Sequence, residues 1–598
     1  MTVVSEKCCV FESSAMRLNF SLEQGVRLEE IFNKKSNRNW LTEKSEVFSI
    51  EILGERKPAS EFTIVSVQAL RDKKDEGFSI DLRWDKWGID ARIIVISDEK
   101  ADCAIFLKLG GKWPDSQPQE VYFGMPFIKN FRTEGSKWRL SAKPAARRDG
   151  SSVMTVHQNY PMPACVLSGG DRDGFALRPY EPDTGFGGMI NLTYRWFAMT
   201  SEEEFVDNRI KMLLLDNHPL YSVCDFKITA VEKGWEEAFS RWREDMRHHV
   251  NLREYEREDL RWLREAVFPA YTFSYSRQIY DYERQRLDID QVLDRGDEIG
   301  GFDAVILWHL YPRLGVDYQG QFDFNHNLPG GIDGLRKLID RAHARNVKVI
   351  LPHNPWDDTH ITQEQAIDEM VELVRATDCD GFLLDTMETV PLGLRQKIDA
   401  VKKGVGFISE AAPVNNRMLE IITAHQDQSL EFSDMPQSFV LRYLYPEMNC
   451  FTTGRWRVGE GKDMLIDRMV FNGTGMLVWE EVFGRWLPLS GNHIEKLRKW
   501  RKILETNKDL FCYGVPVPFW TVYQDGLYAN RFMSADGRKA AFSIYNESDR
   551  IITGNLLNSQ LPGFSAIDVW NDVAVTNCDG IICASIAPKQ TLMIIMKG

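Results

Sequence analysis

The 598-residue sequence contains no uninterrupted apolar run near the 18 residues that a membrane-spanning helix needs. Its longest apolar runs, such as Ala304 to Leu310, have the length of a strand. The first residues also lack the basic start, apolar middle and small-residue cleavage site of a signal peptide. We therefore expect no membrane partner and a cytoplasmic location.

Positive charge is in short supply, because 73 Lys and Arg residues stand against 87 Asp and Glu residues, for a net charge of −14. A protein that binds nucleic acid through its phosphates normally carries the opposite balance. The ten cysteines are scattered and include no CxxC pair, which fits neither a zinc-site spacing nor a disulfide framework. Neither nucleic acid nor a structural metal is therefore expected.

What the sequence does contain is a globular mix of 43% hydrophobic and 27% charged residues, with three changes of pattern along the chain. Short alternating runs such as Phe48 to Leu53, separated by turn residues, are typical of a β-sandwich. A charged helical stretch follows, and short strands return after the helix predicted at 494–505. The sequence predicts a multidomain α+β protein with a β-sandwich at 1–229, a helical linker at 230–265, a barrel at 266–510 and a small C-terminal β-sandwich at 511–598.

The middle third repeats a unit of apolar run, polar loop and helical stretch. Eight such units over about 250 residues predict a (β/α)8 TIM barrel. One of its helices carries an apolar stripe that begins at Leu335, and another opens with a capping box of Thr362 and Gln365. The candidate strands begin near Val267, Ala304, Val347, Gly381, Gly404, Ser429, Asn449 and Gly473.

The carboxyl ends of barrel strands are where an active site is expected. The fourth predicted strand ends at Asp385, and the fifth ends 25 residues later at Glu410. Two carboxylates on adjacent strand ends suit retaining glycoside cleavage, in which one attacks the anomeric carbon and the other serves as acid and then base. We predict Asp385 as nucleophile and Glu410 as acid/base. Asp434, at the end of the sixth predicted strand, is a rival acid, a sugar ligand or a helix cap.

Aromatic and polar residues follow the second, third and eighth predicted strands. Sugars stack their C–H faces on indole rings and hydrogen-bond to fixed donors and acceptors, so these residue types are expected to line a sugar pocket. Glu480 has a second interpretation, as the ion-pair partner of an arginine such as Arg485. The predicted substrate-binding residues are Trp308, His309, His353, Asn354, Trp356, Asp357, Trp479 and Glu480.

Two other chemistries lack their motifs. A metal-dependent barrel hydrolase usually carries His-x-His on its first strand, but Tyr271 to Tyr275 contains no histidine. A phosphate-binding barrel needs a glycine-rich loop after the seventh or eighth strand, and the glycines of Phe471 to Gly475 precede the eighth. We therefore expect no metal and no cofactor.

A β-sandwich, a barrel with DGFLLD on its fourth strand and a small β-domain together resemble the retaining α-glycosidases of the α-galactosidase superfamily and the endo-α-N-acetylgalactosaminidase family. The resemblance in architecture covers most of the chain. The resemblance in sequence motifs is confined to the ends of the fourth and fifth strands. It implies an α-linked galactose or N-acetylgalactosamine glycone and Asp385 as nucleophile. The implied acid/base is Glu410, as in the endo-acting family, or Asp434, as in the α-galactosidases. The α-amylase family is less similar, because its arginine two residues before the nucleophile is Leu383 here.

Two alternatives remain open at this point. The barrel could be the scaffold of a carbohydrate-binding or regulatory protein, since fold alone does not determine function. It could also be a transglycosylase, which uses the same residues but excludes water from the glycosyl-enzyme. An oligosaccharide or glycoside is the expected partner in each case, and the sequence leaves linkage, exo or endo action and oligomeric state undetermined.

Overall fold

The computed structural model of the chain contains two compact units, Met1–His249 and Val250–Gly598. The structure describes residues 2–71, 76–97, 103–111, 119–124, 153–155, 165–168, 174–179, 210–214, 218–231, 240, 243, 244, 247, 250–309, 319–358, 361–387, 390–410, 416–427, 440–453, 461–482, 485–518 and 520–598.

The first unit consists of antiparallel sheets, as the alternating sequence predicts. In β11, for example, Ile93 and Val95 are buried while Ile94 between them is partly exposed, the pattern of a sheet with one face in the core. The three sheets have the orders β1-β2-β3-β4-β5 with β6 on β4, β14-β15-β16-β18-β12-β11-β10-β9, and β17-β13-β7-β8. Their strands are β1 (Thr2–Val4), β2 (Cys8–Glu12), β3 (Met16–Ser21), β4 (Arg27–Asn33), β5 (Arg38–Asn39), β6 (Ser45–Glu46), β7 (Ser49–Ile52), β8 (Glu55–Pro58), β9 (Thr63–Arg71), β10 (Glu76–Trp84), β11 (Ile89–Ser97), β12 (Cys103–Gly111), β13 (Gln119–Gly124), β14 (Val153–Thr155), β15 (Cys165–Ser168), β16 (Gly174–Pro179), β17 (Ile210–Leu214) and β18 (His218–Val231).

The second unit contains an eight-stranded parallel sheet in the order β27-β26-β25-β24-β23-β22-β19-β28. A parallel bridge between Thr452 and Met476 joins the two ends of this order, so the sheet closes into the predicted barrel. Every residue of β22 is buried, as expected for a strand covered on both faces. The barrel strands are β19 (Pro269–Phe273), β22 (Ala304–Trp308), β23 (Lys348–His353), β24 (Gly381–Leu384), β25 (Gly406–Ser409), β26 (Ala424–Asp427), β27 (Asn449–Thr452) and β28 (Val478–Trp479).

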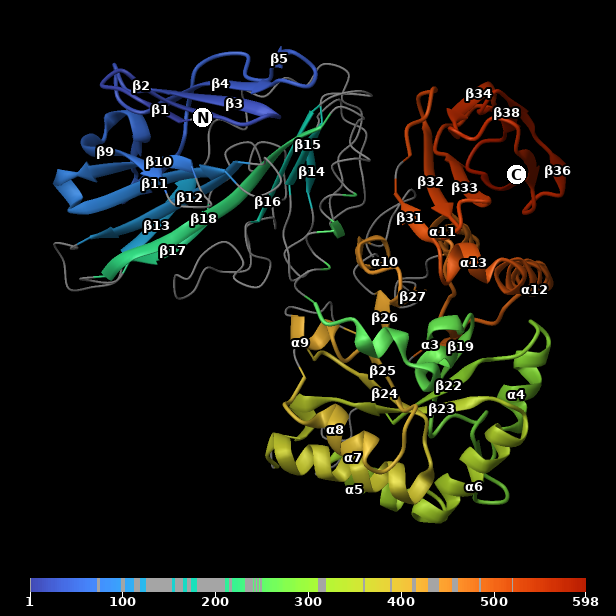
Figure 1. Cartoon of the computed structure of the whole chain (residues 1–598). Coiled ribbons are helices and arrows are strands. Elements are labelled where there is room, and N and C mark those ends of the chain that lie inside the picture. Colours follow the sequence, from blue (N-terminus) through green and yellow to red (C-terminus); the bar gives the residue numbers. More distant parts are fainter. Residues whose placement is uncertain are drawn as a thin grey trace. The chain divides into compact units, whose positions relative to one another are not determined.

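Helices cover the outside of the barrel strands (Figure 1). The stripe predicted from Leu335 is buried on α6, and Thr362 and Gln365 form the expected capping box of α7. Within the described part of the chain no helix is both long and apolar enough to cross a membrane. The helices of this unit are α3 (Arg261–Glu265), α4 (Asp290–Asp297), α5 (Gln321–Asn327), α6 (Gly331–Ala344), α7 (Gln363–Thr377), α8 (Leu394–Asp399), α9 (Asn416–Leu419), α10 (Val440–Leu444), α11 (Lys462–Asn472), α12 (Gly491–Thr506) and α13 (Lys508–Phe511).

The sixth strand was predicted in the wrong place. The prediction began near Ser429, whereas β26 is Ala424–Asp427. The segment that forms β26 reads Ala-His-Gln-Asp and has no apolar run, while the following Ser-Leu-Glu-Phe alternates as a strand does. His425 is nevertheless buried, because its Nδ1 forms a 2.8 Å hydrogen bond with Ser409 Oγ of β25. A polar strand inside a barrel is stabilised by such a neighbour, which the local sequence does not show.

Antiparallel sheets form the C-terminal part of the second unit, as predicted. Both Asn530 Nδ2 and Ser543 Oγ donate hydrogen bonds to the carbonyl oxygen of Phe471, which ties this part to α11 of the barrel. The sheets have the orders β31-β32-β33-β39-β35-β36 and β34-β38-β37. Their strands are β31 (Val515–Val517), β32 (Leu527–Met533), β33 (Lys539–Asn546), β34 (Ile552–Asn558), β35 (Ser565–Asp568), β36 (Val573–Ala574), β37 (Thr576–Cys578), β38 (Ile581–Ile586) and β39 (Thr591–Lys597).

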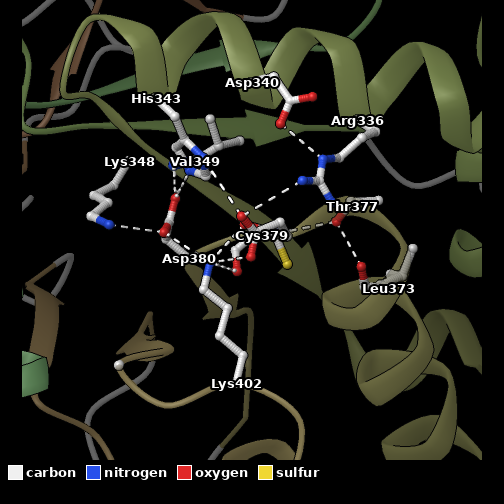
Figure 2. Close-up of polar contacts among 12 residues, drawn as sticks. Arg336, Asp340, His343, Lys348, Val349, Leu373, Thr377, Cys379, Asp380 and Lys402 are labelled. Atoms are coloured by element: carbon white, nitrogen blue, oxygen red, sulfur yellow. Dashed lines mark hydrogen bonds and ion pairs between the residues drawn. The ribbon is translucent and has the colours of Figure 1, made fainter.

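A buried charge cluster lies at the amino end of β24 (Figure 2). Asp380 Oδ2 bonds to His343 Nε2 at 2.6 Å and accepts from the Val349 N–H at 3.0 Å. Asp380 Oδ1 accepts from Lys348 Nζ and Lys402 Nζ, each at 3.1 Å. Burial alone would raise the pKa of Asp380, but the bond to His343 and the two lysine charges hold that pKa well below its ordinary range. The cluster anchors the strand whose other end carries Asp385.

Candidate active site

The predicted nucleophile Asp385 directly follows β24 and lies at the carboxyl end of the barrel. Its side chain is buried, with 1% of its surface exposed. The backbone N–H of Asp385 donates to the carbonyl oxygen of His353 at 2.9 Å, which continues the pairing of β23 with β24. The side-chain amide of Asn354 donates to Asp385 Oδ2. Residues that follow two adjacent strands therefore hold the carboxylate in one orientation.

Asn354 is itself held by Gln321, a residue that sequence reasoning missed. The Asn354 N–H donates to Gln321 Oε1 at 2.9 Å, and Gln321 Nε2 donates to the Asn354 carbonyl oxygen at 2.7 Å. Both side chains are buried. Gln321 therefore fixes the backbone of Asn354, whose side chain bonds to Asp385. No local pattern marks it, because the partners are 33 residues apart and on separate elements.

The predicted acid/base Glu410 directly follows β25, the neighbour of β24. Its carboxylate oxygen Oε2 accepts a hydrogen bond from the backbone N–H of Thr386 at 2.9 Å. Thr386 comes directly after Asp385 and has a φ of +52°, a left-handed conformation that is strained for a β-branched residue. The structure thus brings the Glu410 carboxylate to the residue next to Asp385, and the local strain lies at that junction.

Trp308 and Trp479 end the strands on either side of β19, and both indoles are buried. Tyr271 of β19 lies between them, with its ring centroid 5.7 Å from that of Trp308 and 4.3 Å from that of Trp479. The imidazole of His309, also buried, lies 5.8 Å from the Trp308 ring. The structure gathers these three predicted residues into one aromatic cluster, with Tyr271 as an additional member.

His353 is the last residue of β23, and its ring stacks on Phe322 with the centroids 5.9 Å apart. Burial lowers the pKa of His353 to about 4, so its imidazole is neutral at pH 7. Asp357 is also buried, on the short turn after β23. The side chain of Trp356, on the same turn, lies outside the described residues.

A pocket adjoins His353. Its walls come from the segments that follow β23 and β24 and from the first turns of α7, and they are mainly apolar. Ile361, Ile367 and Leu394 contribute, together with Met387, which comes two residues after Asp385. The ends of the third and fourth strands thus carry an apolar hollow beside the polar residues.

Glu480 lies after β28, and Arg295 of α4 contacts both of its carboxylate oxygens. Arg295 Nε donates to Oε2 and Nη2 donates to Oε1, each at 3.0 Å. The backbone N–H of Leu489 also donates to Oε1, at 2.6 Å. The structure therefore places Glu480 in a buried ion pair, and the partner is Arg295 rather than Arg485.

Asp434, the rival acid, lies outside the described residues. The sixth strand ends at Asp427, so Asp434 is not the residue that ends it, contrary to the prediction. Within the described ranges, no three His, Cys, Asp or Glu side chains are grouped to hold a metal ion. At the ends of β24 and β25 the described site therefore carries a buried carboxylate, Asp385, and a partly exposed one, Glu410. Two carboxylates in unlike surroundings can take the separate roles of nucleophile and acid/base.

No protein-family model matches the sequence, and no curated protein matches it significantly. Solved structures do match along the whole chain. A variant of the GH36 α-galactosidase AgaA from Geobacillus stearothermophilus, in complex with 1-deoxygalactonojirimycin, is 9% identical with a TM-score of 0.51 and covers 99% of this chain and 100% of its own. Another AgaA variant, in complex with stachyose, is 9% identical with a TM-score of 0.50 and the same coverage.

The galactosidase domain of the α-galactosidase-sucrose kinase AgaSK is 10% identical with a TM-score of 0.50, and the match covers 100% of both chains. At such low identity these likenesses concern the fold. They confirm the expected fold, with antiparallel sheets before and after a barrel in the sequence, as similar to that of these α-galactosidases. The resemblance to the endo-acting family stays a prediction.

Proposed function

We propose that this protein is a retaining α-glycosidase with a glycone of galactose or N-acetylgalactosamine type. The observation that carries the proposal is the pairing at two adjacent strand ends. Asp385 is buried and held by Asn354, and the Glu410 carboxylate bonds to the backbone of the next residue, Thr386. The fold shared with the α-galactosidase AgaA, whose variants were solved with 1-deoxygalactonojirimycin and with stachyose, supports the same assignment.

In the proposed first step, a carboxylate oxygen of Asp385 attacks the anomeric carbon while the glycosidic C–O bond breaks. Glu410 gives its proton to the departing oxygen, which leaves as an alcohol. In the second step Glu410 takes a proton from water, and the resulting hydroxide displaces Asp385 from the anomeric carbon. Two inversions restore the original anomer. Asn354 keeps the nucleophile aligned through both steps.

The test is turnover of aryl α- and β-glycosides by the wild type and by Asp385→Asn, with the first-formed anomer followed by NMR. We expect one α-glycoside to be cleaved with retention and the variant to be slower by roughly 10⁴-fold or more. Asp378→Asn, at the C-cap of α7 and before the amino end of β24, is the matched control and should retain full activity. An active, folded Asp385→Asn variant would rule out this nucleophile.

The acid/base is assigned by leaving-group dependence. Glu410→Gln should slow substrates with poor leaving groups far more than activated aryl glycosides, because the latter need no proton. If Asp434→Asn shows that pattern instead, the acid is Asp434. Substrate affinity without any turnover, unchanged in Asp385→Asn, would favour a carbohydrate-binding protein, and transfer to an added acceptor sugar would favour a transglycosylase.

A further inference from the structure

Exposed aromatic side chains gather on two loops at the carboxyl end of the barrel. Tyr275 and Tyr282 belong to the loop after β19 and are 39% and 56% exposed. Trp486 belongs to the hairpin of β29 (Glu481–Val482) and β30 (Arg485–Trp486), after β28, and is 54% exposed. Because β19 and β28 are parallel neighbours, both loops leave the same part of the barrel rim.

Hydrogen bonds hold the two loops together. The hydroxyl of Tyr282 donates to the carbonyl oxygen of Tyr275 at 2.9 Å. The hydroxyl of Ser276, the next residue, donates to Glu481 Oε2, and Glu481 lies directly opposite Trp486 in the hairpin. Side chains of directly opposed residues share one face of a hairpin, so Trp486 lies on the face that meets Ser276. These bonds bring the loop of Tyr275 and Tyr282 and the hairpin of Trp486 together, and we call the three aromatics the aromatic rim.

The aromatic rim is continuous with the buried aromatic cluster of the candidate site. The Tyr275 ring stacks on Phe273 with centroids 5.2 Å apart. Phe273 is 6.1 Å from Trp479, which in turn contacts Tyr271. A chain of rings thus runs from solvent at the rim to the interior of the barrel. Aromatic rings left exposed at the mouth of a barrel are costly in water and are typical of a surface that binds a ligand.

The strand order places this rim opposite the candidate carboxylates. Asp385 and Glu410 follow the fourth and fifth strands, whereas the rim follows the first and eighth. Strand spacing and tilt give an eight-stranded barrel a diameter on the order of 15 Å. A glycone held at Asp385 cannot itself span that distance, so the rim can contact only more distant parts of a substrate.

We propose that the aromatic rim of Tyr275, Tyr282 and Trp486 binds the further sugar units of an α-linked oligosaccharide whose glycone is at Asp385. The inference rests on the proposed glycosidase function and extends it, because it assigns a preference for oligosaccharides over simple glycosides. Exposed tyrosine and tryptophan rings offer flat apolar faces for the C–H surfaces of sugars. The Tyr282 hydroxyl, whose proton is donated to Tyr275, can still accept a hydrogen bond from a sugar hydroxyl.

The test compares stachyose with p-nitrophenyl α-galactoside in Trp486→Ala and Tyr282→Ala. Each variant should lower kcat/KM for stachyose by roughly three- to tenfold, mainly through KM, and leave the aryl galactoside within twofold. Tyr523→Ala removes an aromatic of similar exposure, 48%, from the segment between β31 and β32 and should change neither value. Equal losses on both substrates, or no loss on stachyose, would overturn the proposal.

A binding measurement tests the proposal for the aromatic rim separately from the proposed glycosidase function. In the Asp385→Asn background, calorimetric titration with stachyose should give a Kd that Trp486→Ala raises by a similar factor, whether or not the wild type turns any glycoside over. If the wild type turns over stachyose and the rim variants do so equally well, only the proposal for the aromatic rim is refuted. Absence of stachyose binding in this background also refutes the proposal for the aromatic rim. A changed oligomeric state of Trp486→Ala in size-exclusion chromatography refutes it too, and indicates that the rim is a protein interface.

Discussion

Replacing Asp380 by asparagine should destabilise the barrel without touching the candidate active site. The carboxylate accepts four hydrogen bonds, from His343, Lys348, Lys402 and the Val349 backbone, and its side chain is 2% exposed (Figure 2). Asparagine has the same shape, but it carries no charge and turns an N–H₂ group toward donors.

The size of the stability loss in Asp380→Asn follows from the burial of the carboxylate. Removing one partner from a buried ion pair costs about 3 to 5 kcal/mol, because the other charges remain behind. Lys348 and Lys402 are 40% and 24% exposed and can turn partly toward water, which favours the lower end of that range. We expect a loss of about 3 kcal/mol at pH 7, or roughly 6 °C in the melting temperature of the barrel.

The assay is urea unfolding of the full chain followed by tryptophan fluorescence. Asp378→Asn is the matched control, since Asp378 pairs with the same Lys402 at 3.0 Å but is 40% exposed, and its loss should stay below about 1 kcal/mol. Because folding lowers the pKa of Asp380, its contribution is complete above the unfolded pKa of about 4 and is lost as the pH falls below it. The gap between wild type and Asp380→Asn should therefore narrow from pH 5 to pH 3. Equal losses in both variants, or a gap independent of pH, would refute this reasoning.

Two further predictions concern the candidate site. Folding lowers the pKa of His353 from 6.5 to about 4, so the unfolded chain binds the extra proton as the pH falls, and stability is lost below about pH 6.5. Between pH 7 and pH 5 the wild type should lose about 2 kcal/mol more than His353→Gln, as measured by urea midpoints at both pH values. Glu480→Gln should cost about 2 kcal/mol of stability, since Arg295 loses its bidentate partner, while KM for the best glycoside stays within twofold. A raised KM at unchanged stability would instead make Glu480 a substrate ligand.

The prediction of each strand end depended on whether the strand has a continuous apolar run in the sequence. The run from Gly381 to Leu384 is apolar throughout, and an added Cβ on Gly381 would lie 2.7 Å from the Gly406 carbonyl oxygen, so only glycine fits between these strands. The positions of the residues that follow β24 and β25 could thus be predicted from the sequence. The sixth strand could not, because its polar residues are stabilised by contacts with β25 rather than by an apolar pattern.

The sequence by itself determined the order of sheets and helices, the barrel and the strand ends that carry Asp385 and Glu410, because apolar periodicity and chain order are local properties. Only the tertiary structure decided which side chains meet. Arg295 and Glu480 are 185 residues apart, and the bond from Ser276 to Glu481 that joins the aromatic rim spans 205. Such partners come from separate elements whose relative register no local pattern contains. They become neighbours only when the parallel strands close into a barrel.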